Sequence, residues 1–163
     1  MKNKFGFILV NPQLGENIVA SARSIKNFGF KKLSIVAPKF VFPNHKTKVT
    51  SVGAYDIIKN TKVFKSTEKA ISEFDIIISL SARRRDLNKK HISIKDFSNI
   101  LKKKKNINFG LMFGPEASGL SNKDISLSNY VLQIPTSKKF KSLNLSHSVT
   151  ILCYEIFRVL NNK

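Results

Sequence analysis

Residues 113–122 read Phe-Gly-Pro-Glu-Ala-Ser-Gly-Leu-Ser-Asn and close an apolar run over residues 107–113. A second polar stretch, Lys141-Ser-Leu-Asn-Leu-Ser146, comes shortly after the apolar run 130–134. In both places a predicted buried strand ends in a loop rich in Gly, Ser or Asn, and a helix is expected next. Ligands of open α/β sheets bind in the crevice beyond the carboxyl ends of the strands. The two loops therefore predict a site for a small polar molecule that is held largely by backbone groups.

The apolar runs along the rest of the chain predict an α/β fold. Strands are expected at residues 5–10, 33–37, 62–64, 74–80, 107–113 and 130–134. Helices are expected at residues 15–28, 66–72, 93–101 and 144–160, with a further short helix before Asn60. Because strands alternate with helices, we predict a mostly parallel six-stranded sheet with helices on both faces. The chain shows no internal repeat or linker, so residues 1–163 are expected to form a single domain.

The chain is strongly basic, with 29 Lys and Arg against 10 Asp and Glu and a formal net charge of +19. Such an excess favours a polyanionic partner, most simply nucleic acid. A compositional bias towards Lys is the alternative explanation, but it does not readily account for the shortage of acidic residues. No apolar run reaches the roughly 18–20 residues that cross a bilayer, and residues 1–5 do not resemble a secretion signal. We therefore expect a cytoplasmic protein without a membrane partner.

Several classes of catalytic site have little support. The single Cys153 excludes an internal disulfide, and its apolar helical surroundings favour buried packing. His45, His91 and His147 are scattered and lack a partner at helical spacing, so no metal site is predicted. The chain also lacks a Gly-x-Ser-x-Gly elbow, a Walker loop and a Gly-x-Gly-x-x-Gly fingerprint. Phosphate-cradling nucleotide chemistry is therefore disfavoured.

Arg23 stands out in the predicted first helix because small residues, Ala20 to Ala22, precede it. Small side chains leave room for a ligand to approach the guanidinium group, although a solvated surface cation is the common alternative at such a position. Residues 142–146 place polar atoms at the start of the closing helix, where backbone N–H groups collect.

Three segments together resemble the motifs of the SpoU (TrmH) group in the SPOUT superfamily. The first holds Asn17, Arg23 and Asn27-Phe-Gly29, the second is residues 113–122, and the third joins Ile134-Pro-Thr to residues 142–146. The resemblance extends over nearly the whole chain. The loop Ser81-Ala82-Arg83 is similar to one in the TrmJ branch, which is the closest likeness. Members of this group are S-adenosylmethionine-dependent RNA ribose 2′-O-methyltransferases.

The resemblance implies a Rossmann-like sheet with a C-terminal trefoil knot that binds the cofactor in a bent conformation. It also implies a homodimer in which each site borrows from its neighbour. The implied activity is 2′-O-ribose methylation of RNA, with tRNA and its anticodon loop as the leading substrate and no metal. Two alternatives stay open: an rRNA 2′-O-methyltransferase, and a non-catalytic RNA-binding protein that retains the fold.

Site residues follow from the matched motif positions. The resemblance implies catalytic roles for Arg23, Ser142 and Asn17, and RNA contacts from Arg23, Arg83, Arg84 and Arg85. The implied cofactor-binding residues are Leu80, Ser81, Ala82, Gly114, Glu116, Ile134, Lys141, Ser142, Leu143 and Asn144. Because the pKa of free Arg exceeds 12, Arg23 is preferred as a phosphate clamp and a stabiliser of developing alkoxide charge rather than as a base.

Two features depart from the family pattern. Val19 stands where the family usually has Gly, which is expected to narrow the space beside Arg23. The sequence ends just after the closing helix, so the C-terminal extension of the TrmJ branch is not expected. The turn Lys102–Lys105 is a further candidate for phosphate contacts, against the alternative of a solvated charge run. The closing helix has more apolar surface than one contact needs, which predicts a second buried face against an identical chain, with one wide face on a single core as the alternative. Its main stripe is Leu145, Val149, Leu152, Ile156 and Leu160, with Tyr154 and Phe157 off that line.

Overall fold

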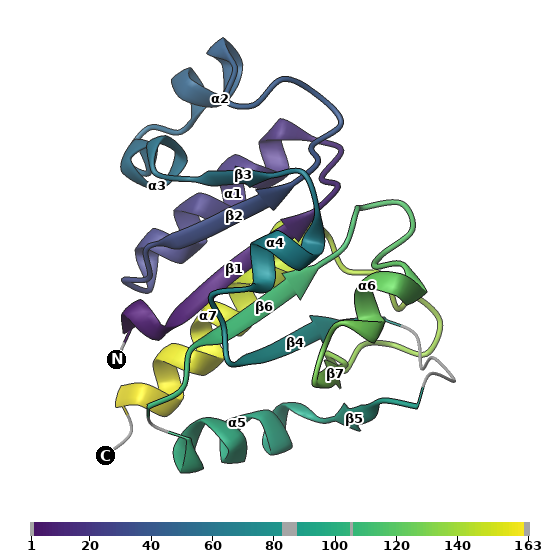
Figure 1. The fold of residues 1–163 in the computed structure, drawn as a ribbon. Helices are drawn as coiled ribbons and strands as arrows, with labels where there is room; N and C mark the ends of the chain where they lie inside the picture. Colours follow the sequence, from purple (N-terminus) through teal and green to yellow (C-terminus); the bar gives the residue numbers. More distant parts are fainter. Residues whose placement is uncertain (1, 83–87, 105, 162–163) are drawn as a thin grey trace.

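Seven strands form one sheet in the order β3-β2-β1-β6-β4-β7-β5, and each neighbouring pair is parallel (Figure 1). The computed structural model describes residues 2–82, 88–104 and 106–161. The strands are β1 Phe5–Val10, β2 Lys32–Val36, β3 Lys62–Phe64, β4 Ile76–Leu80, β5 Lys90–Ile92, β6 Phe109–Phe113 and β7 Tyr130–Leu132. The parallel α/β architecture is confirmed, but the prediction of six strands is wrong. The additional strand, β5, has three residues of which two are basic, so no apolar run marks it in the sequence.

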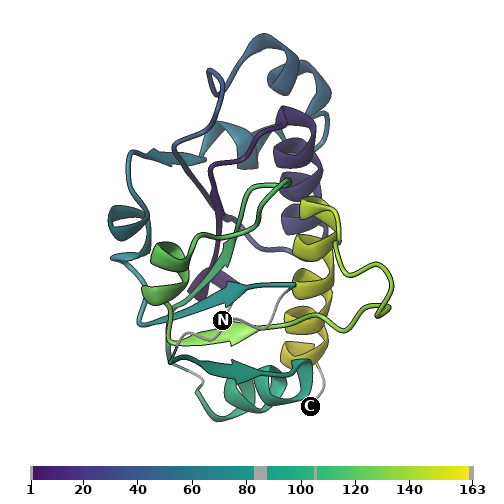
Figure 2. The ribbon, with the colours of Figure 1, turned by 90° about the vertical axis from the view of Figure 1, so that its right-hand side faces the viewer.

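Helices cover both faces of this sheet, with α1 and α7 on one side and α4 and α6 on the other (Figure 2). The helices are α1 Gly15–Asn27, α2 His45–Thr50, α3 Tyr55–Lys59, α4 Thr67–Ile71, α5 Ile94–Lys103, α6 Asn122–Ser126 and α7 Leu145–Asn161, after a 3-10 turn at Lys2–Lys4. The sequence did not predict the short helix α2, whereas α6 lies where a helix is expected after residues 113–122. Within the described ranges, no helix is both long and apolar enough to span a membrane.

The expected lysine turn at residues 102–105 is also corrected. Lys102 and Lys103 belong to the last turn of α5, where positive side chains interact favourably with the helix dipole. Lys105 lies outside the described residues.

Alternating side chains of the strands build a separate core on each face of the sheet. In β1, Phe7 and Leu9 pack towards α1 and α7, whereas Ile8 and Val10 pack towards α4 and α6. This alternation follows from the period of two residues in a strand. Because both faces are covered, the central strands are apolar at nearly every position. They were therefore the easiest elements to predict from the sequence.

A buried acidic residue of α7 forms a hydrogen bond with α5. Glu155 is 7% exposed, and its carboxylate accepts hydrogen bonds from the Ser98 hydroxyl and from the Arg158 guanidinium, the latter at 2.6 and 3.0 Å. The hydrogen bond from Arg158 lowers the pKa of Glu155, and that from Ser98 lowers it further. Cys153, on the same helix, is buried as predicted, and burial raises the pKa of its thiol.

Replacing Glu155 with Gln should lower the free energy of unfolding by about 1–3 kcal/mol at pH 7, because a charged hydrogen-bonding group inside the fold is lost. The pKa of Glu155 is lowered in the folded state. The carboxylate therefore makes its full contribution to the free energy of unfolding above the unfolded pKa of about 4.3. This contribution is lost as the pH falls through the lower pKa of the folded state. The difference in free energy of unfolding between the two proteins, measured by urea titration, should therefore disappear in acid. Glu73→Gln, which removes a surface ion pair with Lys62, should change stability by less than about 0.5 kcal/mol. An equal gap at pH 3 and pH 7 would contradict this account.

Candidate active site

A cavity of about 320 Å³ lies beyond the carboxyl ends of β4, β6 and β7. It is lined by all of the predicted cofactor-binding residues except Asn144. The rest of the lining was not predicted and comes mostly from the same two loops: Phe113, Pro115, Ala117, Ser118, Gly119, Leu120, Leu132, Leu145 and Ser148. The two loops singled out in the sequence therefore meet at one edge of the sheet.

Gly114 lets the loop after β6 fold back tightly on itself. A Cβ atom at this position would lie 2.1 Å from the backbone nitrogen of Leu120 and 2.3 Å from the carbonyl carbon of Gly119. Both contacts are with backbone, so no side chain can move aside to make room. Gly119 has a φ of +70°, a left-handed conformation that glycine adopts without steric cost. The loop therefore forms a tight turn whose residues 113–120 line the cavity.

Glu116 joins this loop to the segment between β1 and α1. Its carboxylate accepts hydrogen bonds from the backbone N–H groups of Gln13 at 2.9 Å and Leu14 at 3.2 Å. Leu14 is the residue at the start of α1 and offers no polar side chain to cap the helix. In return, the Gln13 side-chain oxygen accepts a hydrogen bond from the Ala117 N–H at 3.1 Å. Glu116 therefore fixes the loop as well as lining the cavity.

Asn17 extends the same chain of hydrogen bonds to the start of α7. Its amide nitrogen donates to Glu116 at 2.8 Å, and its oxygen accepts from the amide of Asn144 at 3.1 Å. The oxygen of Asn144 accepts from the N–H and the hydroxyl of Ser146 at 2.8 and 2.7 Å. Asn144 faces a second hollow beside the cavity rather than the cavity itself. All three motifs are thus linked by side-chain hydrogen bonds.

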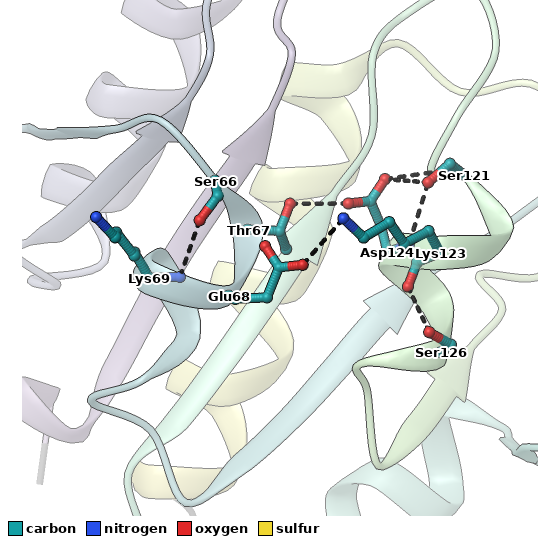
Figure 3. A network of polar contacts seen from close by, with 8 residues as sticks. All are labelled: Ser66, Thr67, Glu68, Lys69, Ser121, Lys123, Asp124 and Ser126. Carbon is teal, nitrogen blue, oxygen red and sulfur yellow. Dashed lines mark hydrogen bonds and ion pairs between the residues drawn. The ribbon is translucent and has the colours of Figure 1, made fainter.

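A separate polar network anchors the far end of the loop after β6 (Figure 3). Asp124 in α6 accepts hydrogen bonds from the Thr67 hydroxyl at 2.8 Å and from Ser121, which caps the same helix. Lys123 forms an ion pair with Glu68 in α4 at 3.1 Å. The sequence pattern Ser121-x-x-Asp124 is a readable capping box. Its contact with Thr67 depends on the fold and therefore could not be predicted from the sequence.

Arg23 lies apart from these residues within one chain. It is exposed on α1, does not line the cavity, and forms no hydrogen bond or ion pair with the described residues. Ser142 is exposed and lines both the cavity and the second hollow. Val19 is 6% exposed within the core. The predicted RNA contacts Arg83, Arg84 and Arg85 fall outside the described residues.

Comparisons with known proteins agree over nearly the whole chain. The model of the SpoU rRNA Methylase family matches residues 4–154. The tRNA (cytidine-2′-O-)-methyltransferase TrmJ of Methanocaldococcus jannaschii is 38% identical over 154 residues, which are 92% of this chain and 66% of that protein. The chain therefore spans just under two thirds of the length of this relative.

Solved structures show the same similarity in three dimensions. TrmJ from Z. mobilis superposes with a TM-score of 0.88 at 30% identity, covering 97% of this chain and 70% of the other. A probable methylase family protein from Haemophilus influenzae superposes with a TM-score of 0.90 at 31% identity, covering 100% and 70%. With the family model matched from residue 4 to residue 154, the chain belongs to the SpoU rRNA Methylase family.

Proposed function

We propose that this chain transfers a methyl group from S-adenosylmethionine to a ribose 2′-hydroxyl of RNA, with tRNA as the substrate. The observation that carries the proposal is the hydrogen-bonded chain Glu116–Asn17–Asn144–Ser146, which joins all three motifs beside the cavity. The M. jannaschii relative, a tRNA (cytidine-2′-O-)-methyltransferase, supports tRNA as the substrate. The net charge of +19 suits an RNA substrate.

The cavity has the chemistry that the cofactor requires. Its volume of about 320 Å³ falls within the usual range for small-molecule sites, roughly 300–1,000 Å³. Leu80, Ile134 and Leu143 provide apolar surface for an adenine ring, and the tight turn at Gly114 exposes backbone groups to its edge. Lys141 provides a cation for the carboxylate of the methionine part. When bound, S-adenosylmethionine supplies the electrophilic methyl group.

The chain's own residues then have to aim the ribose oxygen and manage its proton. A 2′-hydroxyl is a weak acid, so transfer requires its oxygen to be aligned and its proton to be drawn off. Ser142 lies where the cavity meets the second hollow, and its hydroxyl oxygen can accept a hydrogen bond from the 2′-hydroxyl there, from which the released proton passes to solvent. Arg23 holds an RNA phosphate and stabilises the negative charge that develops on the oxygen. Asn17 positions the surrounding motifs through its two hydrogen bonds.

The proposal includes the family's trefoil knot and a single methyltransferase domain over residues 1–163. The knot would lie in the segment from residue 133 onward, which connects β7 to α7 and supplies one side of the cavity. Superposition on family members over 97% and 100% of the chain supports both points.

A homodimer completes the proposed site, because Arg23 does not line the cavity of its own chain. Aromatic side chains on α1 and α7 supply an interface. Phe28 forms edge contacts with Tyr154 and Phe157 at ring distances of 6.2 and 5.6 Å, and Tyr154 remains 55% exposed. The main apolar stripe of α7 is mostly buried in its own core, so these rings are the surplus surface. Arg23 of one copy then serves the cavity of the other.

Incubation with labelled S-adenosylmethionine and total RNA tests the function directly. Labelled 2′-O-methyl nucleosides in the tRNA fraction are expected. Label in rRNA instead would favour the rRNA enzyme, and RNA binding without any label would favour a non-catalytic RNA-binding protein.

Gly114→Ala should weaken binding of S-adenosylhomocysteine by at least about tenfold, because a methyl group at this position forces the backbone of the cavity loop to move. Calorimetry in excess chelator measures the affinity, since the described residues contain no cluster of His, Cys, Asp and Glu suited to a metal. Gly53→Ala is the matched control: its φ is +80°, and no atom lies within 4 Å of the added Cβ. It should lose about 1 kcal/mol of stability and keep cofactor binding. Equal affinity of the two variants for S-adenosylhomocysteine would contradict the assignment of the cavity as the cofactor site.

Arg23→Ala should reduce methyl transfer by at least about a hundredfold, while affinity for S-adenosylhomocysteine stays within about twofold. Arg23→Lys should not restore activity, because the planar guanidinium fork is lost. Because Arg23 is exposed, both variants should fold normally, which a thermal melt of each variant checks. Near-normal turnover of the Ala variant would remove Arg23 from the mechanism.

Tyr154→Glu should convert a dimer into a monomer at micromolar concentration and abolish methyl transfer, because it places a charge in the proposed aromatic interface. Val52→Glu is the control, since Val52 is 79% exposed at the turn between α2 and α3. Sedimentation velocity measures both variants. A stable monomer that still methylates RNA would refute the shared site.

A further inference from the structure

The segment between β7 and α7 carries the most exposed aromatic ring of the chain. Phe140 is 76% exposed, whereas every other phenylalanine is buried or half-buried. A ring exposed in this way offers its face to a ligand that can stack on it. The segment projects from the sheet beside α7 (Figure 2), so a large partner can reach it.

Unpaired positive charge surrounds this ring. Lys138, Lys139 and Lys141 flank it in sequence, and they form no ion pair with the described residues. Residues 125–154 contain no Asp or Glu at all. An aromatic ring among lysines suits single-stranded nucleic acid, in which a base stacks on the ring and phosphates meet the cations.

The segment also lies between two hollows that adjoin the cofactor cavity. Phe140 lines a hollow of about 700 Å³ that shares Glu116, Ser142 and Leu143 with the cavity. Lys138 lines another of about 520 Å³, with His91, Ser93 and Thr136, which shares Lys141 with the cavity. A strand whose ribose reaches the cavity can therefore place neighbouring nucleotides across the segment.

Local hydrogen bonds give the segment a defined turn. The Lys139 N–H donates to the Ser137 hydroxyl at 3.3 Å, and the Thr136 hydroxyl donates to the Lys141 carbonyl at 3.4 Å. Preordering of this kind reduces the entropy lost when a ligand binds.

We propose that residues 138–140 form a stacking platform for RNA. In this platform Phe140 stacks on an unpaired base next to the target ribose, and Lys138 and Lys139 contact phosphates of that strand. The inference rests on the proposed function, because it names the part of the substrate that lies beside the methylated nucleotide.

Fluorescence anisotropy with labelled bulk tRNA and with a single-stranded oligoribonucleotide tests the stacking. Phe140→Ala should weaken both affinities by about fivefold to a hundredfold, and Phe140→Tyr should restore them because the aromatic face returns. Phe140→Leu keeps apolar area without a ring and should remain weak. Val41→Ala is the control, since Val41 is 80% exposed in the loop after β2. Affinities for S-adenosylhomocysteine should be the same in all four variants.

Salt titrations test the phosphate contacts. Lys138→Gln should reduce the slope of log affinity against log salt by about 0.7 for the single strand, whereas Lys59→Gln, on α3 at the opposite end of the sheet, should leave it unchanged.

Three outcomes overturn the platform: RNA affinity of Phe140→Ala within twofold of the unmodified chain, equal affinity of the Leu and Tyr variants, or altered sedimentation of Phe140→Ala. The last would make Phe140 part of a contact between copies of the chain. RNA binding that depends on Phe140 in a chain that methylates no RNA would overturn the proposed function alone. Normal methylation without any effect of Phe140 would overturn the platform alone.

Discussion

The carboxylate of Glu116 is the interaction on which the site depends. A parallel sheet brings the loops after β1 and β6 and the start of α7 to one edge, but each loop arrives with backbone N–H groups that need partners. Glu116 accepts from two of these groups at the start of α1 and from Asn17, which in turn binds Asn144. Hydrogen bonds to a charged acceptor contribute about 1.5–3 kcal/mol each. Removing this one side chain would leave three segments without a common anchor.

The sequence predicted the features that depend on local chemistry. Continuous apolar runs marked β1, β4 and β6, since a strand covered on both faces has no polar side. The motif residues that follow these strands identified the cavity, and nearly all of them line it. The roles of these residues could be assigned only from the family resemblance, because Gly, Ser and Asn after a strand are also typical of ordinary turns.

Features that depend on distant contacts could not be predicted in this way. β5 is recognisable only from its pairing with β7, because Lys90 and His91 look like loop residues. Nothing around Thr67 indicates that its hydroxyl binds Asp124, 57 residues away. Glu116 was assigned to the cofactor, whereas its hydrogen bonds to Gln13 and Leu14 involve backbone atoms that carry no sequence signal.

The few acidic side chains are almost all engaged within the fold, which leaves the positive charge of the chain facing outward. Each acid in the described ranges either pairs with a cation or accepts a backbone hydrogen bond. Ion pairs involve Glu16, Asp56, Glu68, Glu73 and Glu155. Backbone hydrogen bonds involve Asp75, Asp96, Glu116 and Asp124. A polyanion that approaches this surface therefore meets few free carboxylates.

The two outermost strands of the sheet, β3 and β5, have a consequence for how the chain behaves at high concentration. An open sheet edge offers unpaired backbone groups to any other strand, which makes long flat edges prone to aggregation. Both edges here are only three residues long, and each carries lysine, Lys62 on one side and Lys90 on the other. Addition of a foreign strand would gain few hydrogen bonds and would bring like charges together. Crowding of the molecules is therefore not expected to extend the sheet into a fibre.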